Sequence, residues 1–364
     1  MGCDGALIGG GGIGREGSGL DAGAVVRRFG LDGQAAEWLE AAAGLPELPG
    51  WGAGEVASVG ERGARELLAP LGLGAEDAAE LVGLWSGEWP REAAWLVERM
   101  AARVAADLGA ALEPVPVWVG WPSLAGVADD RARCAALFAF AVSVRAFEEY
   151  QRGRGVPAGV VAATLRDVGR QAAVNRRMFG RVGLETASWV ALLFRSGFYE
   201  LGRLQFEPNV LGEAGAVRWL SEGERRGFAG MGELAEGAPV LRVHIPSGGR
   251  LDAGEVAESL GRARSFFAGW LGVDYPVATC SSWLLDPQLA EYLPEGSNIL
   301  AFQRLFRLVE RGAPGDADVF RFVLGMPEVD PGRAPRGSRL ERAAADHVAA
   351  GRHWRVRTGW LRLR

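Results

Sequence analysis

The chain has 364 residues, 48% of them hydrophobic, so it is long enough for two domains or for one domain with a large extension. Its formal net charge of -5 at pH 7 argues against a nucleic-acid partner, because a phosphate-binding protein presents a basic face. The sequence contains no lysine, so every basic residue is arginine. This excludes a Schiff-base lysine and a lysine-bearing phosphate loop.

The cysteines and apolar runs indicate the compartment. Cys3, Cys134 and Cys280 are too few and too scattered for a disulfide framework or a cysteine metal site. The apolar runs are broken well short of a membrane span, and the N-terminus lacks a basic stretch followed by an apolar core. We therefore expect a cytoplasmic protein that does not insert into a membrane. His347 and His353 lack a completing thiol or carboxylate, so no metal is expected.

Residues 1–19 are rich in glycine, and Gly9, Gly11 and Gly14 match the dinucleotide-binding pattern G-x-G-x-x-G. That loop needs a strand before it and a helix after it. Only three apolar residues precede the glycines here, and no helix-forming sequence follows them. We predict a disordered leader, because glycine-rich polar segments bury too little surface to offset the entropy of ordering.

The next part of the chain has apolar residues at helical spacing. Its last helix is expected to start after Pro157, since proline favours the first turn of a helix. We predict a helical N-terminal domain over residues 20–180. Its predicted elements are a helical bundle at about 21–112, a short strand at 115–119, and helices at 129–152 and 158–179.

Strands and helices alternate in the second half of the chain. Residues 198–207 alternate apolar and polar side chains, which predicts a half-buried strand with one polar face. We predict an α+β fold in which residues 181–364 form a mixed central sheet flanked by helices. The further predicted elements are strands at 216–220 and 240–245, a helix at 253–270, a strand at 276–283, a helix at 287–311, a strand at 318–325, a helix at 338–350 and a strand at 353–363.

Several motifs in this half are distinctive. They are FYELGRLQF (198–206), VHIP (243–246), SWLLDPQL (282–289), SNI (297–299), HWR (353–355) and TGWL (358–361), with GRQ (169–171) and RMFG (177–180) upstream. Together with the element order, they resemble an actinobacterial acyltransferase family that joins an N-acyltransferase N-terminal domain to a GNAT-like C-terminal domain. The resemblance implies an N-acyltransferase that moves an acyl group from acyl-CoA or an acyl carrier protein to a small-molecule amine by direct attack.

The loop after the strand at 240–245 is the best candidate for binding the thioester donor. Its expected binding residues are Ser247, Gly248, Gly249 and Arg250. The glycines allow close approach of the backbone, and the start of the following helix favours an anion by about 0.3–1 kcal/mol. Asp252 and Glu255 have capping-box spacing. The loop departs from the usual GNAT pattern Gln/Arg-x-x-Gly-x-Gly/Ala, and the alternative is an ordinary turn whose capping aspartate occupies the amides.

Acyl transfer to an amine needs a base for the amine proton and a donor to the oxyanion. Glu207, at the end of a strand, or His244, before the binding loop, could be the base directly or through water. Ser281 is predicted to offer a hydrogen bond to the cleft. GNAT enzymes place an acidic tyrosine late in the helix where Phe306 stands here, so Tyr292 is the alternative acid.

Other interpretations remain open for the same residues. His244 could be a satisfied core histidine and Glu207 a solvated strand end. The chain could be a non-catalytic GNAT-like module that senses a ligand or assists a partner. A hydrolase using Ser281 or Cys280 is a third interpretation, although the chain has no G-x-S-x-G elbow.

Overall fold

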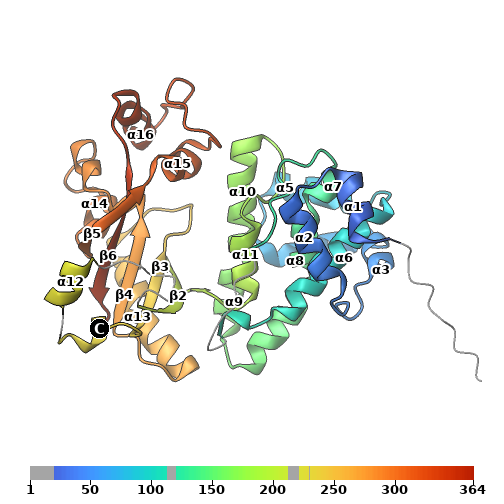
Figure 1. Ribbon diagram of the computed structural model, residues 1–364, viewed down its shortest axis with the longest axis horizontal. Helices are drawn as coiled ribbons and strands as arrows, with labels where there is room; N and C mark the ends of the chain where they lie inside the picture. Colours follow the sequence, from blue (N-terminus) through green and yellow to red (C-terminus); the bar gives the residue numbers. More distant parts are fainter. Residues whose placement is uncertain (1–19, 113–119, 212–220, 229) are drawn as a thin grey trace, which may run out of the picture.

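The computed structural model describes residues 20–112, 120–211, 221–228 and 230–364. It has two lobes: a helical lobe built by the first half of the chain and a sheet lobe built by the second half (Figure 1). The predicted leader and the predicted strands at 115–119 and 216–220 lie outside the described residues.

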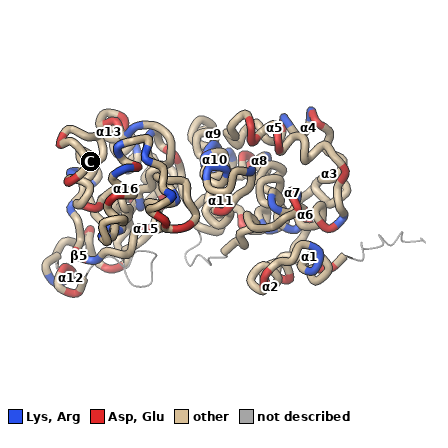
Figure 2. The backbone as a smooth tube through the Cα atoms, turned by 90° about the horizontal axis from the view of Figure 1, so that it is seen from above, with Lys and Arg blue, Asp and Glu red and all other residues tan. Residues whose placement is uncertain are grey.

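The helical lobe packs around two long helices, α6 and α8, whose alanine-rich sequences bury nearly every side chain along their central turns. The helices are α1 (Ala22–Phe29), α2 (Gly33–Ala43), α3 (Ala53–Ala57), α4 (Glu61–Leu68), α5 (Ala75–Trp85), α6 (Arg91–Ala106), α7 (Asp130–Arg133), α8 (Ala135–Gly153), α9 (Ala158–Leu165), α10 (Asp167–Phe179) and α11 (Ala187–Phe194). The helix predicted at 158–179 is therefore two helices, which meet at Arg166. In both views, helices α10 and α11 lie on the side of the helical lobe that faces the sheet lobe (Figures 1 and 2).

The described residues of the sheet lobe form one mixed sheet of six strands in the order β1-β2-β3-β4-β6-β5. Only β3 and β4 run parallel; the other neighbours are antiparallel. The strands are β1 (Tyr199–Glu200), β2 (Gln205–Val210), β3 (Pro239–His244), β4 (Val277–Ser282), β5 (Arg307–Pro314) and β6 (Arg355–Arg362). The helices are α12 (Glu222–Gly227), α13 (Ala253–Leu271), α14 (Asn298–Gln303), α15 (Asp316–Val319) and α16 (Arg339–Ala349). The predicted α+β fold is confirmed.

The parallel strands separate partway along their length. Strands β3 and β4 pair only from Val240–Val277 to Arg242–Thr279. Beyond that point β3 continues to His244 against β2, and β4 continues to Ser282 against β6. An opening therefore forms between two central strands, directly before the loop that leads into α13.

Three predicted elements differ from the structure. The strand predicted at 198–207 is a hairpin, because β1 and β2 are joined by a turn over residues 201–204, in which Gly202 has φ of 88°. The helix predicted at 287–311 is interrupted after a 3₁₀ turn, since Pro294 and Gly296 end the helical path before Ser297 caps α14. Its last residues form β5 instead.

The strand predicted at 318–325 is helical: α15 continues into a π-helical turn, Phe320–Leu324. Short apolar runs of this kind do not distinguish a strand from a buried helix. Val319, Phe320 and Leu324 are buried there, a spacing that places them on one helical face.

Candidate active site

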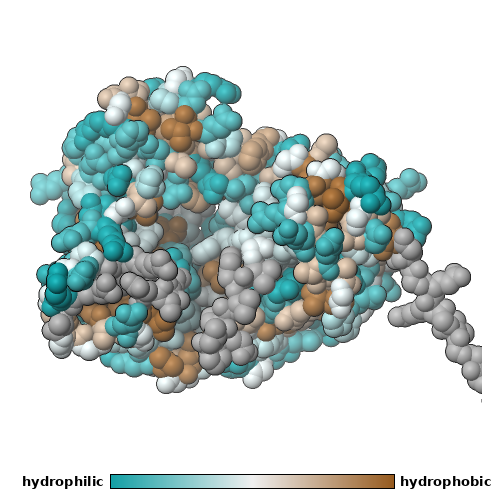
Figure 3. Space-filling model, in the orientation of Figure 1, coloured by the Kyte–Doolittle hydropathy of each residue, from teal (hydrophilic) through white to brown (hydrophobic). Residues whose placement is uncertain are grey.

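A cleft of about 950 Å³ lies between the two lobes. Figure 3 shows the molecule hollowed in this region. The helical lobe contributes Gln171, Val174, Arg177, Thr186 and Trp189 to its lining. The sheet lobe contributes the separated ends of β3 and β4, the loop 246–251, and residues around α14, α15 and α16. The opening in the sheet therefore leads directly into the cleft.

The loop after β3 presents backbone N–H groups without internal acceptors. Within the described residues, the amides of Ser247 to Leu251 donate no hydrogen bond. Gly248 and Gly249 have φ of 84° and 87°, and a Cβ added to either would meet nothing within 4 Å. Successive free amides of this kind form a concave site that favours an anion such as a phosphate.

Arg203, which also lines the cleft, holds this loop in place through its carbonyl groups. Its Nε donates to the carbonyl of Arg250 at 2.8 Å, and its Nη atoms donate to the carbonyls of Pro246 and Gly249, each at 3.2 Å. Because one guanidinium holds three carbonyls, the loop conformation is fixed independently of any ligand. The sequence placed Arg203 only on the polar face of a strand, and nothing local indicates the carbonyls of a loop more than 40 residues away.

The start of α13 is partly occupied by its own cap. Oδ1 of Asp252 accepts from the amides of Gly254 and Glu255 at 2.9 and 3.2 Å. The reciprocal bond of the predicted capping box, in which the Asp252 amide would donate to the carboxylate of Glu255, is absent from the described residues. An anion would therefore meet the loop amides rather than the first turn of the helix. Arg250 is exposed beside them, and its guanidinium has no partner among the described residues.

Glu207 and His244 form a polar pair on neighbouring strands. Nε2 of His244 lies 2.8 Å from Oε2 of Glu207. Arg242 approaches the same carboxylate at 3.3 Å, and Nδ2 of Asn209 donates to its Oε1 at 3.0 Å. Burial alone would raise the pKa of Glu207, but the hydrogen bond from His244 and the charge of Arg242 outweigh it and hold that pKa below its usual value.

His244 and Glu207 differ in their access to the cleft. His244 lines the cleft, whereas Glu207 is 8% exposed and lies behind it, outside the lining. An ionised carboxylate can only accept a hydrogen bond, so Nε2–H of His244 donates to Glu207, and in the neutral imidazole Nδ1 then carries the lone pair. A histidine held in this tautomer by a carboxylate is suited to take a proton from a substrate.

Ser281 lies on β4, across the opening, and lines the cleft with its hydroxyl 2.7 Å from that of Thr358. Its neighbour Cys280 is buried, and burial raises the pKa of that thiol to about 12. A thiol that stays protonated is a poor nucleophile. This argues against a hydrolase that uses Cys280.

The structure does not bring Tyr292 to the other candidates. Its hydroxyl lies 2.9 Å from Nδ1 of His347, and its ring packs near Trp354. Tyr292 is not among the residues that line the cleft, whereas His244, Ser281 and the loop 247–250 are.

The sequence did not reveal the contribution of the helical lobe. The GRQ and RMFG motifs marked residues of α10, but nothing in the sequence assigned them to the site. Much of the cleft wall is apolar and comes from both lobes: Val174, Trp189, Ile245, Trp283, Leu284, Leu293, Ile299, Phe322, Val323 and Leu340. Such a wall suits an acyl chain because it removes apolar surface from water.

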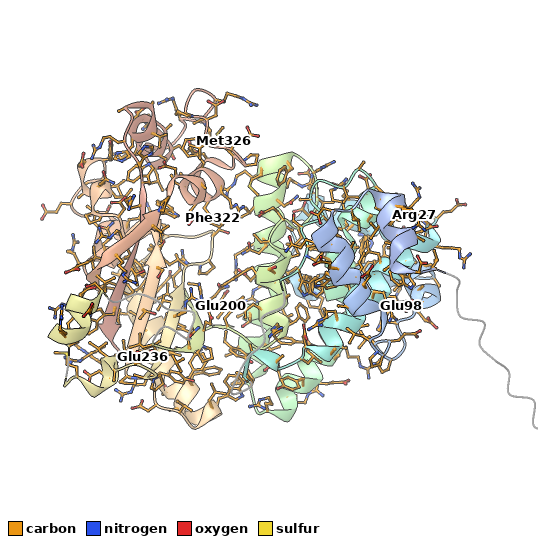
Figure 4. The ribbon with its side chains drawn as sticks, viewed as in Figure 1. Arg27, Glu98, Glu200, Glu236, Phe322 and Met326 are labelled. Atoms are coloured by element: carbon orange, nitrogen blue, oxygen red, sulfur yellow. The ribbon has the colours of Figure 1, made fainter. Side chains whose placement is uncertain are left out.

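Among the polar contacts that join the lobes, two connect the helical lobe to the helical turn that follows α15. Nη2 of Arg177 on α10 donates to the carbonyl of Phe322 at 3.0 Å, and Arg321 pairs with Glu185 at 2.8 Å. Figure 4 shows Phe322 beside the upper end of α10 and Glu200 further down the same interface. The helical lobe therefore encloses the cleft rather than standing apart from it.

The described residues hold neither a metal-binding cluster nor a helix that could cross a membrane. No group of three or more His, Cys, Asp or Glu side chains there is arranged to hold a metal ion. None of the described helices is both long and apolar enough to span a bilayer.

Comparisons with known proteins identify the family. Residues 63–196 match the N-acyltransferase N-terminal domain, and residues 198–361 match the GNAT-like C-terminal domain. The crystal structure of an acyltransferase in complex with decanoyl-CoA and teicoplanin is 31% identical, with a TM-score of 0.76 over 95% of this chain and 100% of that one. The chain belongs to this acyltransferase family.

Two further crystal structures are similar to this chain in sequence identity and in fold. A mutant acyltransferase in complex with octanoyl-CoA is 31% identical, with a TM-score of 0.75 and coverage of 95% of this chain and 100% of that one. An acyltransferase with CoA and 10C-teicoplanin is 30% identical over the same shares, also with a TM-score of 0.75. A comparison with curated proteins gives no match. The domain family and the acyltransferase activity expected from the motifs are confirmed.

Proposed function

We propose that this acyltransferase transfers an acyl group from acyl-CoA to the amine of a small molecule, with His244 as the general base. One observation carries the proposal. The Glu207–His244 pair reaches the cleft where β3 and β4 separate, beside a loop whose amides are free among the described residues. The base and the anion site are thus adjacent in the fold.

The donor site follows from the loop. The pyrophosphate of CoA accepts hydrogen bonds from the amides of Ser247 to Leu251, and Arg250 adds a permanent positive charge. The pantetheine arm then enters the opening, where β3 beyond Arg242 has no parallel partner. An acyl carrier protein would present the same arm on a single phosphate, without the second phosphate and the adenosine, so acyl-CoA makes fuller use of this loop.

The reaction needs one proton transfer to the enzyme and one away from it. The neutral amine attacks the thioester carbonyl carbon, a C–N bond forms, and Nδ1 of His244 takes the amine proton. Ser281 donates a hydrogen bond to the oxyanion. When the C–S bond breaks, the thiolate takes back the proton from His244, so the amide and the free CoA thiol are the only products and Tyr292, which lies outside the cleft lining, is not required.

The cleft indicates the classes of donor and acceptor. Its apolar wall and volume of about 950 Å³ fit an acyl chain of medium length together with a large acceptor. The similar acyltransferase structures contain decanoyl-CoA, octanoyl-CoA or CoA, and two of them contain teicoplanin or 10C-teicoplanin. We infer that the acceptor is an amino group on a bulky, glycopeptide-like small molecule.

The cellular setting is part of the proposal. Scattered cysteines suit a reducing cytoplasm. The arginine-only, glycine-rich composition suits the GC-rich genome of an actinobacterium.

Release of free thiol from decanoyl-CoA tests the proposal. We expect release that depends on added glycopeptide amine, loss of turnover in His244→Ala, and unchanged binding of decanoyl-CoA by that variant. His353→Ala is the matched control, because His353 is exposed and lies outside the cleft. Thiol release without amine would indicate a hydrolase. Binding of decanoyl-CoA with no thiol release under any condition would indicate a sensing module instead.

A further inference from the structure

Trp189, on α11 of the helical lobe, contacts the base in the sheet lobe. Its ring lies 4.7 Å from the imidazole of His244, centroid to centroid, with an interplanar angle of 67°. The indole also stacks on the ring of Phe198, with a distance between ring centroids of 4.4 Å and an interplanar angle of 17°. The imidazole is thus held between a carboxylate, Glu207, and an aromatic side chain that comes from a different lobe.

The indole is itself fixed by a buried carboxylate. Nε1 of Trp189 donates to Oδ2 of Asp167 at 2.7 Å. Asp167 is 1% exposed, and its other bonds come from Nε of Arg170 at 2.8 Å and Nε2 of Gln171 at 3.2 Å. Hydrogen bonds to an ionised group are about twice as strong as neutral ones. The indole therefore has one well-defined orientation, set within the helical lobe.

From these contacts we infer that Trp189 is a positioning residue for His244, and that Asp167 acts through Trp189. The inference rests on the proposed role of His244 as the base. Glu207 fixes one ring nitrogen, and Trp189 restricts rotation of the ring, so that Nδ1 keeps one direction. The helical lobe then contributes to catalysis as well as to the cleft wall.

The expected effect is on the chemical step. A general base contributes about 100- to 10,000-fold, and a displacement of about 1 Å costs about 100-fold. We expect Trp189→Ala to lower kcat by about 30- to 100-fold while KM for acyl-CoA stays within about threefold. Trp189→Phe retains the aromatic contact but loses the bond to Asp167, so it should recover only part of kcat and fall between Trp189→Ala and wild type. Asp167→Asn keeps an acceptor for the indole but loses the charge, so a loss of about 5- to 20-fold is expected.

Trp270→Ala is the matched control. The rings of Trp270 and Tyr199 have a centroid distance of 4.7 Å and an interplanar angle of 70°, nearly the geometry of the Trp189–His244 contact. Trp270 does not line the cleft. Melting temperatures of all variants separate loss of packing from loss of positioning. We expect Trp270→Ala to melt at a lower temperature and yet retain kcat.

A double-mutant cycle decides the inference. If Trp189 acts through His244, then Trp189→Ala added to His244→Ala lowers the residual rate no further. Full additivity of the two losses would overturn the inference, as would kcat of Trp189→Ala within about threefold of wild type. Should Trp189→Ala fail to fold, the same cycle with Asp167→Asn decides. Wild-type turnover by His244→Ala would instead refute the proposed base, so the two failures are distinguishable.

Discussion

Substitution of Glu207 by glutamine is the sharpest perturbation of the pair with His244. The amide has nearly the shape of the carboxylate, so packing at this 8% exposed position is preserved. The charge is lost, and with it the ion pair with Arg242 at 3.3 Å. The charged hydrogen bond from Nε2 of His244 at 2.8 Å is replaced by a weaker one to a neutral amide, whose NH2 can also donate to Nε2. The imidazole is then free to adopt the other tautomer, in which Nδ1 carries the proton and is no longer a base.

The magnitude follows from the strength of one charged hydrogen bond. Such a bond contributes about 1.5–3 kcal/mol, and about 1.4 kcal/mol corresponds to tenfold in rate, so kcat of Glu207→Gln should fall by about 10- to 150-fold. The assay is steady-state thiol release at saturating decanoyl-CoA and amine, with the dissociation constant of decanoyl-CoA measured in parallel. That dissociation constant should not change, because Glu207 lies behind the cleft lining.

Glu40→Gln is the control, because Glu40 is an exposed glutamate of α2 in the helical lobe. It should retain wild-type turnover. The reasoning is refuted if Glu207→Gln keeps kcat within about twofold of wild type, or if its main effect is weaker binding of decanoyl-CoA.

Three further predictions concern the loop and the pH dependence of stability. Arg203→Ala should raise the dissociation constant of acyl-CoA about tenfold with little change in kcat, because three loop carbonyls lose their donor; calorimetric titration measures it. Gly249→Ala should weaken acyl-CoA binding by about 5- to 30-fold, because a left-handed backbone at φ of 87° costs a residue with a Cβ about 1–2 kcal/mol. The added Cβ itself meets no atom within 4 Å, so the effect comes from the backbone alone. Unchanged affinity would show that the loop does not bind the donor. Because the pKa of Glu207 is lowered in the fold, its ionised form stabilises the protein above the usual glutamate pKa of 4.5. The unfolding free energy of wild type should therefore exceed that of Glu207→Gln above this pH, and the difference should shrink as pH falls below it. A difference that stays constant in denaturant titrations down to low pH would contradict the assignment.

Strong periodicity made part of the sheet lobe predictable. The strand at 240–245 and the helix at 253–270 correspond closely to β3 and α13, and the glycine-containing loop between them was recognised as the donor site candidate. The segment from 287 to 325 was not predictable, because its apolar runs are short and its strand β5 is defined by pairing with β6. Sequence patterns do not encode such non-local pairing.

The active-site candidates show the same limit. The sequence named both Glu207 and His244, but their relative roles depend on which of them reaches the cleft, and that is fixed by the packing of the two lobes. The contacts of Trp189 with His244 and of Arg203 with the loop 246–250 join residues more than 40 positions apart. No local signal distinguishes these side chains from ordinary core or surface residues.

The most direct measurement for the account is a crystal structure with a non-hydrolysable decanoyl-CoA analogue. The account predicts pyrophosphate oxygens within hydrogen-bonding distance of the amides of Ser247 to Leu251, and the thioester carbonyl between the separated ends of β3 and β4, next to His244. An analogue seated instead in the apolar groove between α13 and α14, lined by Val256 and Leu305 and leaving His244 without contact, would contradict it.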